Sequence, residues 1–257
     1  MTGLMNTRQQ KSFNVLLIGD ACEDTYTYGT VDRISPEAPV PVFVPRYTIT
    51  RDGMASNVCK NLENLGCGVN FLFGSTSKKQ RLIDERSKQQ IVRIDNDALT
   101  QEPLEFVTDI PLVYDAIVIS DYNKGTVSYN LIKKIRKEFT GPVFLDTKKH
   151  DLAQFEGCII KVNQLEYSQA TSKPSRSTPL IVTHGDKGVV WDTYNFGAKP
   201  VEVSDVTGAG DTFLAALCYQ YLATDDLHKA IPFAIAASAV TVQHVGCYAP
   251  SIKEVLG

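Results

Sequence analysis

The chain has 257 residues, of which 43% are hydrophobic, and its 26 Lys and Arg residues against 29 Asp and Glu residues leave a net charge of only −3. A chain of this length and composition can bury a large core, but it lacks the basic excess that nucleic-acid binding normally demands. The six cysteines form no CxxC or Cys/His cluster, which disfavours a zinc site or a disulfide framework and is typical of a reducing cytosol. The polar first residues and the lack of a long apolar run predict a cytoplasmic protein that is neither secreted nor embedded in a membrane.

The first part of the chain predicts a buried strand followed by an exposed flap and a helix. Residues 14–20, NVLLIGD, form a short apolar run that ends in Asp20, which is typical of a buried parallel strand whose carboxyl end lies at a ligand site. Prolines interrupt the valines of residues 33–49, which favours an edge strand or a flap over the central sheet. Residues 52–66 have apolar residues at helical spacing and a glycine stop, which predicts a helix, and a strand follows at residues 69–74.

The remainder of the chain alternates strands with helices. Residues 91–95 alternate apolar and charged side chains and predict a second exposed strand. The later elements are strands at residues 116–120, 142–146, 158–162 and 180–191, the last with a turn inside it. Helices are expected at residues 128–139, from a start within residues 205–217, and at residues 227–243. This rhythm indicates a parallel sheet with helices on both faces. The loop at residues 168–179 is too short to separate domains, so we expect one domain over residues 1–257.

The stretch DVTGAGDTFLAAL, residues 205–217, places two glycines directly before a helical apolar run. These glycines let the chain turn and leave the N–H groups of residues 208–210 at a helix N-terminus, which is a favourable place for an anion. Asp211 lies in the first turn, where the helix dipole stabilises its ionised form. A carboxylate beside a phosphate binds it poorly but suits a base that takes a proton from an attacking hydroxyl. The alternative is an ordinary helix start in which glycine serves only the turn.

Five motifs resemble those of the ribokinase/PfkB sugar kinases. The C-terminal D-x-x-G-A-G-D signature is present at residues 205–211, and the other four motifs, in chain order, are LLIGD at 16–20, DGMASNV at 52–58, NQLE at 163–166 and VTHGDKG at 182–188. The resemblance covers nearly the whole chain. It implies a ribokinase-like three-layer α/β sandwich with a mostly parallel sheet, a small β lid at about residues 25–50 and 80–95, and ATP with Mg²⁺ as cofactors.

The resemblance also implies roles for residues on the sugar side of the site. Asp211 would be the base, and the N–H groups of Gly208, Ala209 and Gly210 would stabilise the transferring phosphoryl group. The residues expected to bind sugar hydroxyls are Asp20, Gly53 and Asn57. Asp20 could instead be only a turn residue.

The nucleotide side is assigned in the same way. The residues that would hold ATP, and Mg²⁺ through water, are Asn163, Glu166, Lys148, Thr183, Gly185 and Gly188. Asn163 and Glu166 could equally form an ordinary helix-capping box, because they are three residues apart. Asp205, Thr207 and the backbone near Gly246 would form a potassium site, although Tyr248 stands where the family has a serine.

Three longer strings, at residues 33–42, 89–95 and 120–125, resemble the heptose-7-phosphate kinases of this family. They imply a substrate that already carries a phosphate, with the cations Arg33, Lys124 and Arg93 as its partners. The alternatives are that these charges are solvated lid residues and that the substrate is a free sugar.

The sequence also departs from the family pattern. Met54 replaces the second glycine after Gly53, and DTK at residues 146–148 replaces D-P-K. Two helical units of the family are missing, so a degenerate protein that binds sugar or nucleotide without turnover is an alternative to the enzyme. No Rossmann G-x-G-x-x-G or P-loop motif is present.

The last expectations concern assembly and extent. Val40, Val42 and Val44 form an apolar row that a lone flap could not hide, which predicts a homodimer through the lid. The sequence ends at Gly257, so we expect only a kinase domain, without the nucleotidyltransferase domain fused to some heptose kinases.

Overall fold

The computed structural model describes residues 12–96, 104 and 113–257, and its core is one ten-stranded sheet. The strands are β1 (Asn14–Ile34), β2 (Pro41–Met54), β3 (Gly68–Asp84), β4 (Gln90–Asn96), β5 (Ala116–Asp121), β6 (Val143–Thr147), β7 (Ile159–Asn163), β8 (Leu180–Thr183), β9 (Val189–Trp191) and β10 (Tyr194–Phe196). Their order is β10-β9-β8-β7-β6-β5-β1-β3-β4, with β2 paired to β1. The run from β8 to β3 is parallel, and the pairs at both ends of the sheet are antiparallel. The predicted fold class is confirmed.

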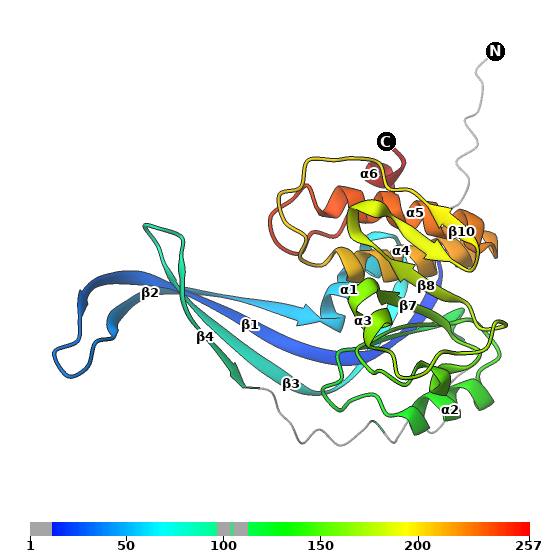
Figure 1. Ribbon diagram of the computed structural model, residues 1–257, viewed down its shortest axis with the longest axis horizontal. Helices are drawn as coiled ribbons and strands as arrows, with labels where there is room; N and C mark the ends of the chain where they lie inside the picture. The colour runs from blue at the N-terminus through cyan, green and yellow to red at the C-terminus, as the bar shows by residue number, and fades with distance from the viewer. Residues whose placement is uncertain (1–11, 97–103, 105–112) are drawn as a thin grey trace, which may run out of the picture.

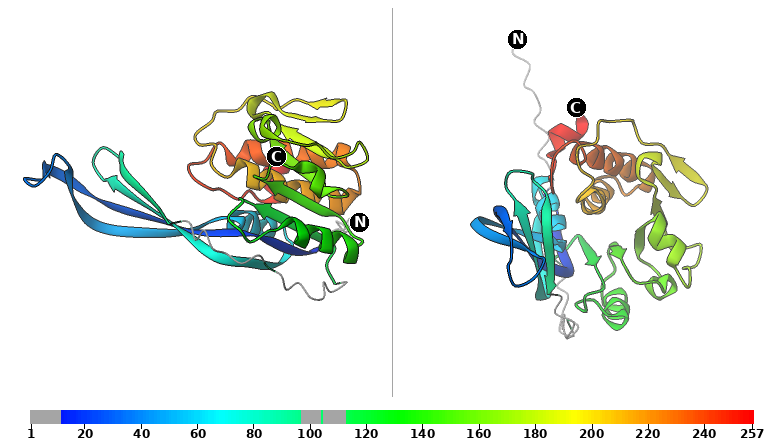
Figure 2. Two further views of the ribbon diagram at one scale, coloured as in Figure 1. Left: turned by 60° about the horizontal axis from the view of Figure 1, so that its bottom comes forward. Right: turned by 60° about the vertical axis from the view of Figure 1, so that its left-hand side comes forward.

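Helices cover both faces of the sheet, as Figures 1 and 2 show. They are α1 (Ala55–Asn64), α2 (Tyr129–Glu138), α3 (Gln164–Gln169), α4 (Ala209–Thr224), α5 (Leu227–Thr241) and α6 (Ile252–Leu256), with short 3₁₀ turns at Leu152–Phe155 and Gly185–Lys187. The helices predicted around α1, α2, α4 and α5 are present. No helix within the described ranges is long and apolar enough to cross a membrane.

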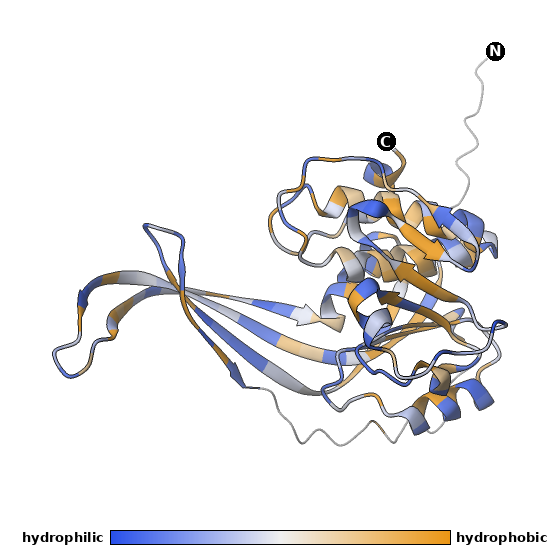
Figure 3. Cartoon of the chain, in the orientation of Figure 1, coloured by the Kyte–Doolittle hydropathy of each residue, from blue (hydrophilic) through white to orange (hydrophobic). Residues whose placement is uncertain are grey.

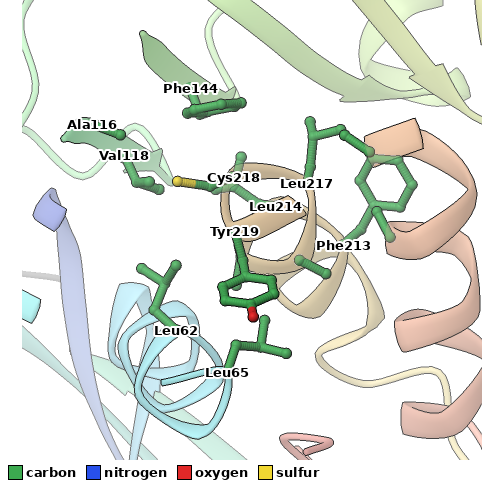
Figure 4. Packing of buried hydrophobic residues seen from close by; sticks show 14 of the residues in the cluster. Leu62, Leu65, Ala116, Val118, Phe144, Phe213, Leu214, Leu217, Cys218 and Tyr219 are labelled. Carbon is green, nitrogen blue, oxygen red and sulfur yellow. The ribbon is translucent and has the colours of Figure 1, made fainter. Parts of the chain in front are cut away.

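Two hydrophobic clusters hold the layers together. On one face, α4 lies between the sheet and its helical neighbours, and its Cys218 and Leu217 pack near Phe144 of β6 while Leu62 of α1 lies below (Figure 4). On the other face, α2 packs its buried side chains, including Ile132, against β5 and β6. Figure 3 shows the same division, because the apolar colour concentrates in the central strands and fades toward the lid. The packing of α4 matters for function because it fixes the helix start that carries Asp211.

The lid is longer than the sequence predicted. β1 and β3 do not stop at the sandwich but continue outward as strands of 21 and 17 residues, and β2 and β4 pair along their outer sides (Figures 1 and 2). A register shift between Gly19 and Ala21 marks the point where β1 leaves the core. The lid therefore occupies about residues 21–54 and 76–96 rather than 25–50 and 80–95.

Candidate active site

Asp211 is the centre of the site and is held by two residues from separate parts of the chain. Its carboxylate is almost buried, with 8% of the residue exposed, in the first turn of α4. The hydroxyl of Tyr122, which follows β5, donates to Oδ1 at 2.8 Å, and Nδ2 of Asn57 on α1 donates to Oδ2 at 2.9 Å. The motif implied that Asn57 binds sugar hydroxyls, but the structure buries it, with 2% exposed, and directs its amide to Asp211; Tyr122 is a further partner.

The charge state of Asp211 has a different cause from the one predicted. The sequence suggested that the helix dipole keeps this group ionised. In the structure, burial is the largest influence and raises the pKa of Asp211, while the hydrogen bonds from Asn57 and Tyr122 oppose that rise. A carboxylate with a raised pKa is a stronger base than an exposed one, which suits proton abstraction.

The glycines before Asp211 shape the start of α4. Gly208 has a left-handed φ of 82°, and a β-carbon at this position would lie 2.7 Å from Nδ2 of Asn57. The N–H group of Ala209 donates to the carbonyl of Val206 at 3.3 Å. The predicted three-donor anion hole is therefore corrected, since the N–H groups of Gly208 and Gly210 are the ones left as candidates for phosphate.

Lys161 is a cation at this helix start that the sequence analysis missed. It lies inside the apolar strand β7 with only 4% of the residue exposed, and its Nζ is 2.6 Å from Oδ2 of Asp146 on β6. A β-carbon on Gly210 would come within 3.0 Å of this Nζ. Burial lowers the pKa of Lys161, but the charge and hydrogen bond of Asp146, together with the charges of Glu166 and Asp211, outweigh burial and raise the pKa, so the ammonium is charged. The sequence feature that could have pointed to Lys161 is that it is the single charged residue in the apolar run CIIKV.

Asp20 does not have the role that the motif implied. It is completely buried, and its two oxygens accept backbone N–H groups from Tyr122 at 2.8 Å, Lys124 at 3.1 Å and Thr126 at 3.2 Å. A carboxylate without exposure cannot contact a sugar in this conformation. Asp20 instead fixes the loop that presents Tyr122 to Asp211.

Asp24, four residues further along β1, lies where a sugar-binding acid was expected. A β-carbon on Gly53 would lie 3.1 Å from its Oδ2, and Nη1 of Arg81 is 2.5 Å from its Oδ1. The second aspartate of GDACED was the signal that could have found it. Next to Gly53, Met54 has a φ of 57°, a conformation that glycine adopts without strain, which explains the second glycine of the family motif.

The lid carries cations close to the site, but they are not the ones predicted. Arg51 and Arg81 lie 5.8 Å and 5.0 Å from the ring centroid of Tyr26, and we call Asp24, Tyr26, Arg51 and Arg81 the inner lid cluster. Nη1 of Arg51 would be 3.1 Å from a β-carbon on Gly246, so the cluster reaches the C-terminal loop beside α4.

The three predicted cations lie in different places. Arg93 on β4 is bound to Asp95 through Nε at 2.7 Å and Nη2 at 2.8 Å. Lys124 belongs to the loop that Asp20 fixes. Arg33 lies nine residues beyond Asp24 on β1, about 30 Å at the usual rise of a strand, and cannot reach Asp211 of its own chain.

The predicted nucleotide residues gather at the ends of β7 and β8. Asn163, Thr183 and Gly185 line one open groove of about 520 Å³. Asn163 and Glu166 form the capping box that the sequence left as an alternative: Oδ1 of Asn163 accepts the N–H of Glu166 at 2.9 Å, and Oε2 of Glu166 accepts that of Asn163 at 2.7 Å. Gly188 is different, because it is buried in a turn with a φ of 90° and serves the backbone.

Glu166 fits a magnesium site bridged by water. Its other oxygen, Oε1, accepts a hydrogen bond from Nζ of Lys148, whose side chain is half exposed. This Nζ lies 5.8 Å from the ring centroid of Tyr122. No cluster of three or more metal-ligating side chains occurs in the described part of the chain. Mg²⁺ beside nucleotides usually needs only one or two carboxylates, together with waters and phosphates, so this arrangement suits it.

Asp205 organises the loop before Gly208. Its Oδ1 accepts the N–H of Thr207 at 2.9 Å and the hydroxyl of Thr207 at 2.7 Å, and its Oδ2 accepts the N–H of Gly246 at 2.9 Å. These hydrogen bonds, with that of the Thr207 hydroxyl the largest, lower the pKa of Asp205. The structure brings together the residues named for potassium.

A buried carboxylate at a glycine-capped helix start, with a lysine beside it and an open groove at the ends of β7 and β8, is typical of a phosphotransferase of ribokinase-like fold. Residues 74–254 match the pfkB family of carbohydrate kinases, and the chain belongs to this family. It is a carbohydrate kinase, which implies the use of ATP.

Two kinds of relatives agree with this assignment. The Bifunctional protein HldE of Nitratiruptor sp. is 32% identical over 297 residues, covering 94% of this chain but only 64% of the relative's length. Among solved structures, Arabidopsis thaliana ribokinase complexed with ribose and ATP has a TM-score of 0.68 at 15% identity, covering 96% of this chain and 98% of that one. Phosphofructokinase-2 from Escherichia coli in complex with fructose-6-phosphate also has a TM-score of 0.68 at 15% identity, with 96% and 97% covered. These structures support the fold.

Proposed function

We propose that this kinase transfers a phosphoryl group from ATP to a hydroxyl of a sugar that already carries a phosphate ester, such as a heptose 7-phosphate. The observation that carries the substrate class is the inner lid cluster, in which Arg51 and Arg81 lie beside Asp24 and Gly53. A free sugar needs only hydroxyl partners, whereas two guanidinium groups suit a phosphate ester. The strings that resemble heptose-7-phosphate kinases, which contain Arg93 and Lys124, support the same class.

In the proposed reaction, Asp211 accepts the proton of the attacking sugar hydroxyl. Asn57 and Tyr122 hold the carboxylate in position, and burial keeps it basic. The N–H groups of Gly208 and Gly210 donate to oxygens of the phosphoryl group as charge shifts toward ADP. Mg²⁺, held through water by Glu166 and Asn163, would neutralise part of the phosphate charge.

The test is an ATP-consumption assay with sugars and their terminal phosphate esters, using the parent and two arginine variants. The parent should prefer the ester. Arg51→Ala should lower kcat/KM for the ester by roughly ten- to a hundredfold, the usual value of about 1.5–3 kcal/mol for a charged hydrogen bond, and should change the free sugar little. Arg86→Ala is the matched control, because Arg86 pairs with exposed Asp32 elsewhere on the lid.

Two outcomes would redirect the proposal. A parent without preference for the ester, or an Arg51→Ala variant that loses both substrates equally, would favour a free-sugar kinase. Binding of sugar or ATP without turnover would favour the degenerate binding protein.

We also propose a homodimer in which the lid of each subunit covers the site of the other. The lid exposes apolar side chains, among them Val44 at 54% and Ile94 at 50%, which is more than a soluble ribbon normally leaves in water. Arg33, too distant from its own site, would then act in the neighbour. A monomeric mass at micromolar concentration, or full ester activity in Arg33→Ala, would count against this arrangement.

A further inference from the structure

Two largely buried lysine–aspartate pairs link neighbouring parts of the sheet, and an ion pair removed from water is costly unless it has a use or a complete set of partners. The pair of Lys149 and Asp121 has such a set. Nζ of Lys149 contacts both carboxylate oxygens at 3.0 and 2.8 Å, and Asp121 also accepts the hydroxyl of Thr147 at 2.6 Å and the N–H of Asn123 at 2.9 Å. This network joins β5 to β6 and has a structural explanation.

The pair of Lys161 and Asp146 has a simpler set of contacts. Among the described residues, Asp146 is the only hydrogen-bond acceptor within reach of Nζ of Lys161, at 2.6 Å. An ammonium group has three donors, so two N–H bonds remain for something else. They lie at the start of α4, because the space beside Nζ is the one that a β-carbon on Gly210 would fill.

We propose that Lys161 is a catalytic residue that donates a hydrogen bond to the transferred phosphoryl group, and that Asp146 is the positioning residue that aims it. The inference rests on the proposed kinase reaction. As the sugar oxygen forms its bond to phosphorus, the bond from phosphorus to the bridging oxygen of ADP breaks, and the hydroxyl proton passes to Asp211. Lys161 stays protonated throughout and binds an oxygen of the phosphoryl group, where charge is spread in the transition state.

Glycine at residue 210 leaves room for the ammonium at the start of α4, because a β-carbon there would lie 3.0 Å from Nζ of Lys161. The competing explanation is that Lys161 only balances its acidic neighbours Asp146, Glu166 and Asp211. In that case its loss would lower stability but would have no special effect on the chemical step.

The experiment compares Lys161→Met with Lys149→Met, which removes the other buried ammonium. For each variant, kcat, KM for the sugar substrate and the urea midpoint are measured. Lys161→Met should lower kcat by about 10²–10³, the usual loss for one donor to a developing charge, with KM changed less than about threefold. Lys149→Met should lower the urea midpoint at least as much as Lys161→Met does, and it should keep kcat within about threefold of the parent.

A double variant keeps the test decisive if the single variant folds poorly. Asp146→Asn combined with Lys161→Met removes both charges of the pair, so neither member is left without its partner. This protein should regain stability without regaining kcat. A kcat within about threefold of the parent in either Lys161 variant, or equal losses of kcat in Lys161→Met and Lys149→Met, would overturn the inference. A parent that turns over none of the sugars would instead overturn the proposed function.

Discussion

Replacing Asp211 with asparagine tests the proposed base with little disturbance of its surroundings. In the parent, the carboxylate accepts hydrogen bonds from the amide of Asn57 and the hydroxyl of Tyr122, at 2.9 and 2.8 Å. An asparagine oxygen can still accept from Asn57. Its NH₂ group would face Tyr122, whose hydroxyl can turn and accept instead of donating. Asp211→Asn therefore preserves both contacts and removes only the charge.

The two expected effects have opposite signs. A positioned general base contributes roughly 10²–10⁴ in rate, about 3–5 kcal/mol of activation free energy, so kcat should fall by that factor. Stability should not fall. Because burial raises the pKa of Asp211 in the folded protein, the stabilising contribution of this group is present below its unfolded pKa and is lost as pH rises through the folded pKa. At pH 8 the variant should unfold at the same or a higher urea concentration.

The assay measures steady-state kcat and the urea midpoint on the same protein samples at pH 8. Asn64→Ala is a suitable control, since Asn64 lies on the same helix as Asn57 but binds the carbonyl of Ala249 on the surface. Near-parent turnover by Asp211→Asn would remove this residue from the mechanism. A large loss of stability would show that the carboxylate is mainly structural.

Three further outcomes follow from the geometry of the site. Tyr122→Phe removes a hydrogen bond that lowers the pKa of Asp211, so the acidic limb of the pH profile of kcat/KM should move to higher pH; an unmoved limb would refute the coupling. Met54→Gly should be more stable to urea than Met54→Ala by about 1–2 kcal/mol, the reverse of the usual order, because only glycine relieves the strain of a positive φ. Glu166→Gln keeps the capping box but loses the charge, so roughly ten- to a hundredfold more Mg²⁺ should be needed for half-maximal activity in a Mg²⁺ titration. An unchanged Mg²⁺ requirement would show that Glu166 does not hold the metal.

The sandwich was predictable because its signals are local. Buried parallel strands appear in the sequence as short apolar runs, as in β5 and β7. The glycines near the start of α4 indicate where that helix begins. Asn57 and Asp211 were assigned to one site through motif order alone, and the structure brings them into contact.

The errors at the site share one cause, which is that a motif gives residue types but not the direction in which side chains point. Asp20 and Asp24 are both acids near the end of the same buried run, yet the first is completely buried under a loop and the second faces Gly53. Only the register of the strands decides between them. Lys161 was missed for the same reason, because a lysine in a strand says nothing about its partner until β6 supplies Asp146.

The lid shows why its strands could not be delimited from the sequence, and the same fact bears on assembly. Residues 75–84 carry polar and charged side chains at most positions, so neither an apolar run nor a strict alternation marks them as a strand. They are a strand because β1 and β4 pair with them on either side. Backbone pairing alone holds a thin ribbon weakly, since stable sheets need a packed apolar face. The lid has such side chains but, within one chain, leaves several of them exposed, including Val44, Val92 and Ile94. A second lid packed against this one would bury them, and this is the physical reason to expect that the lid takes its working form in a dimer.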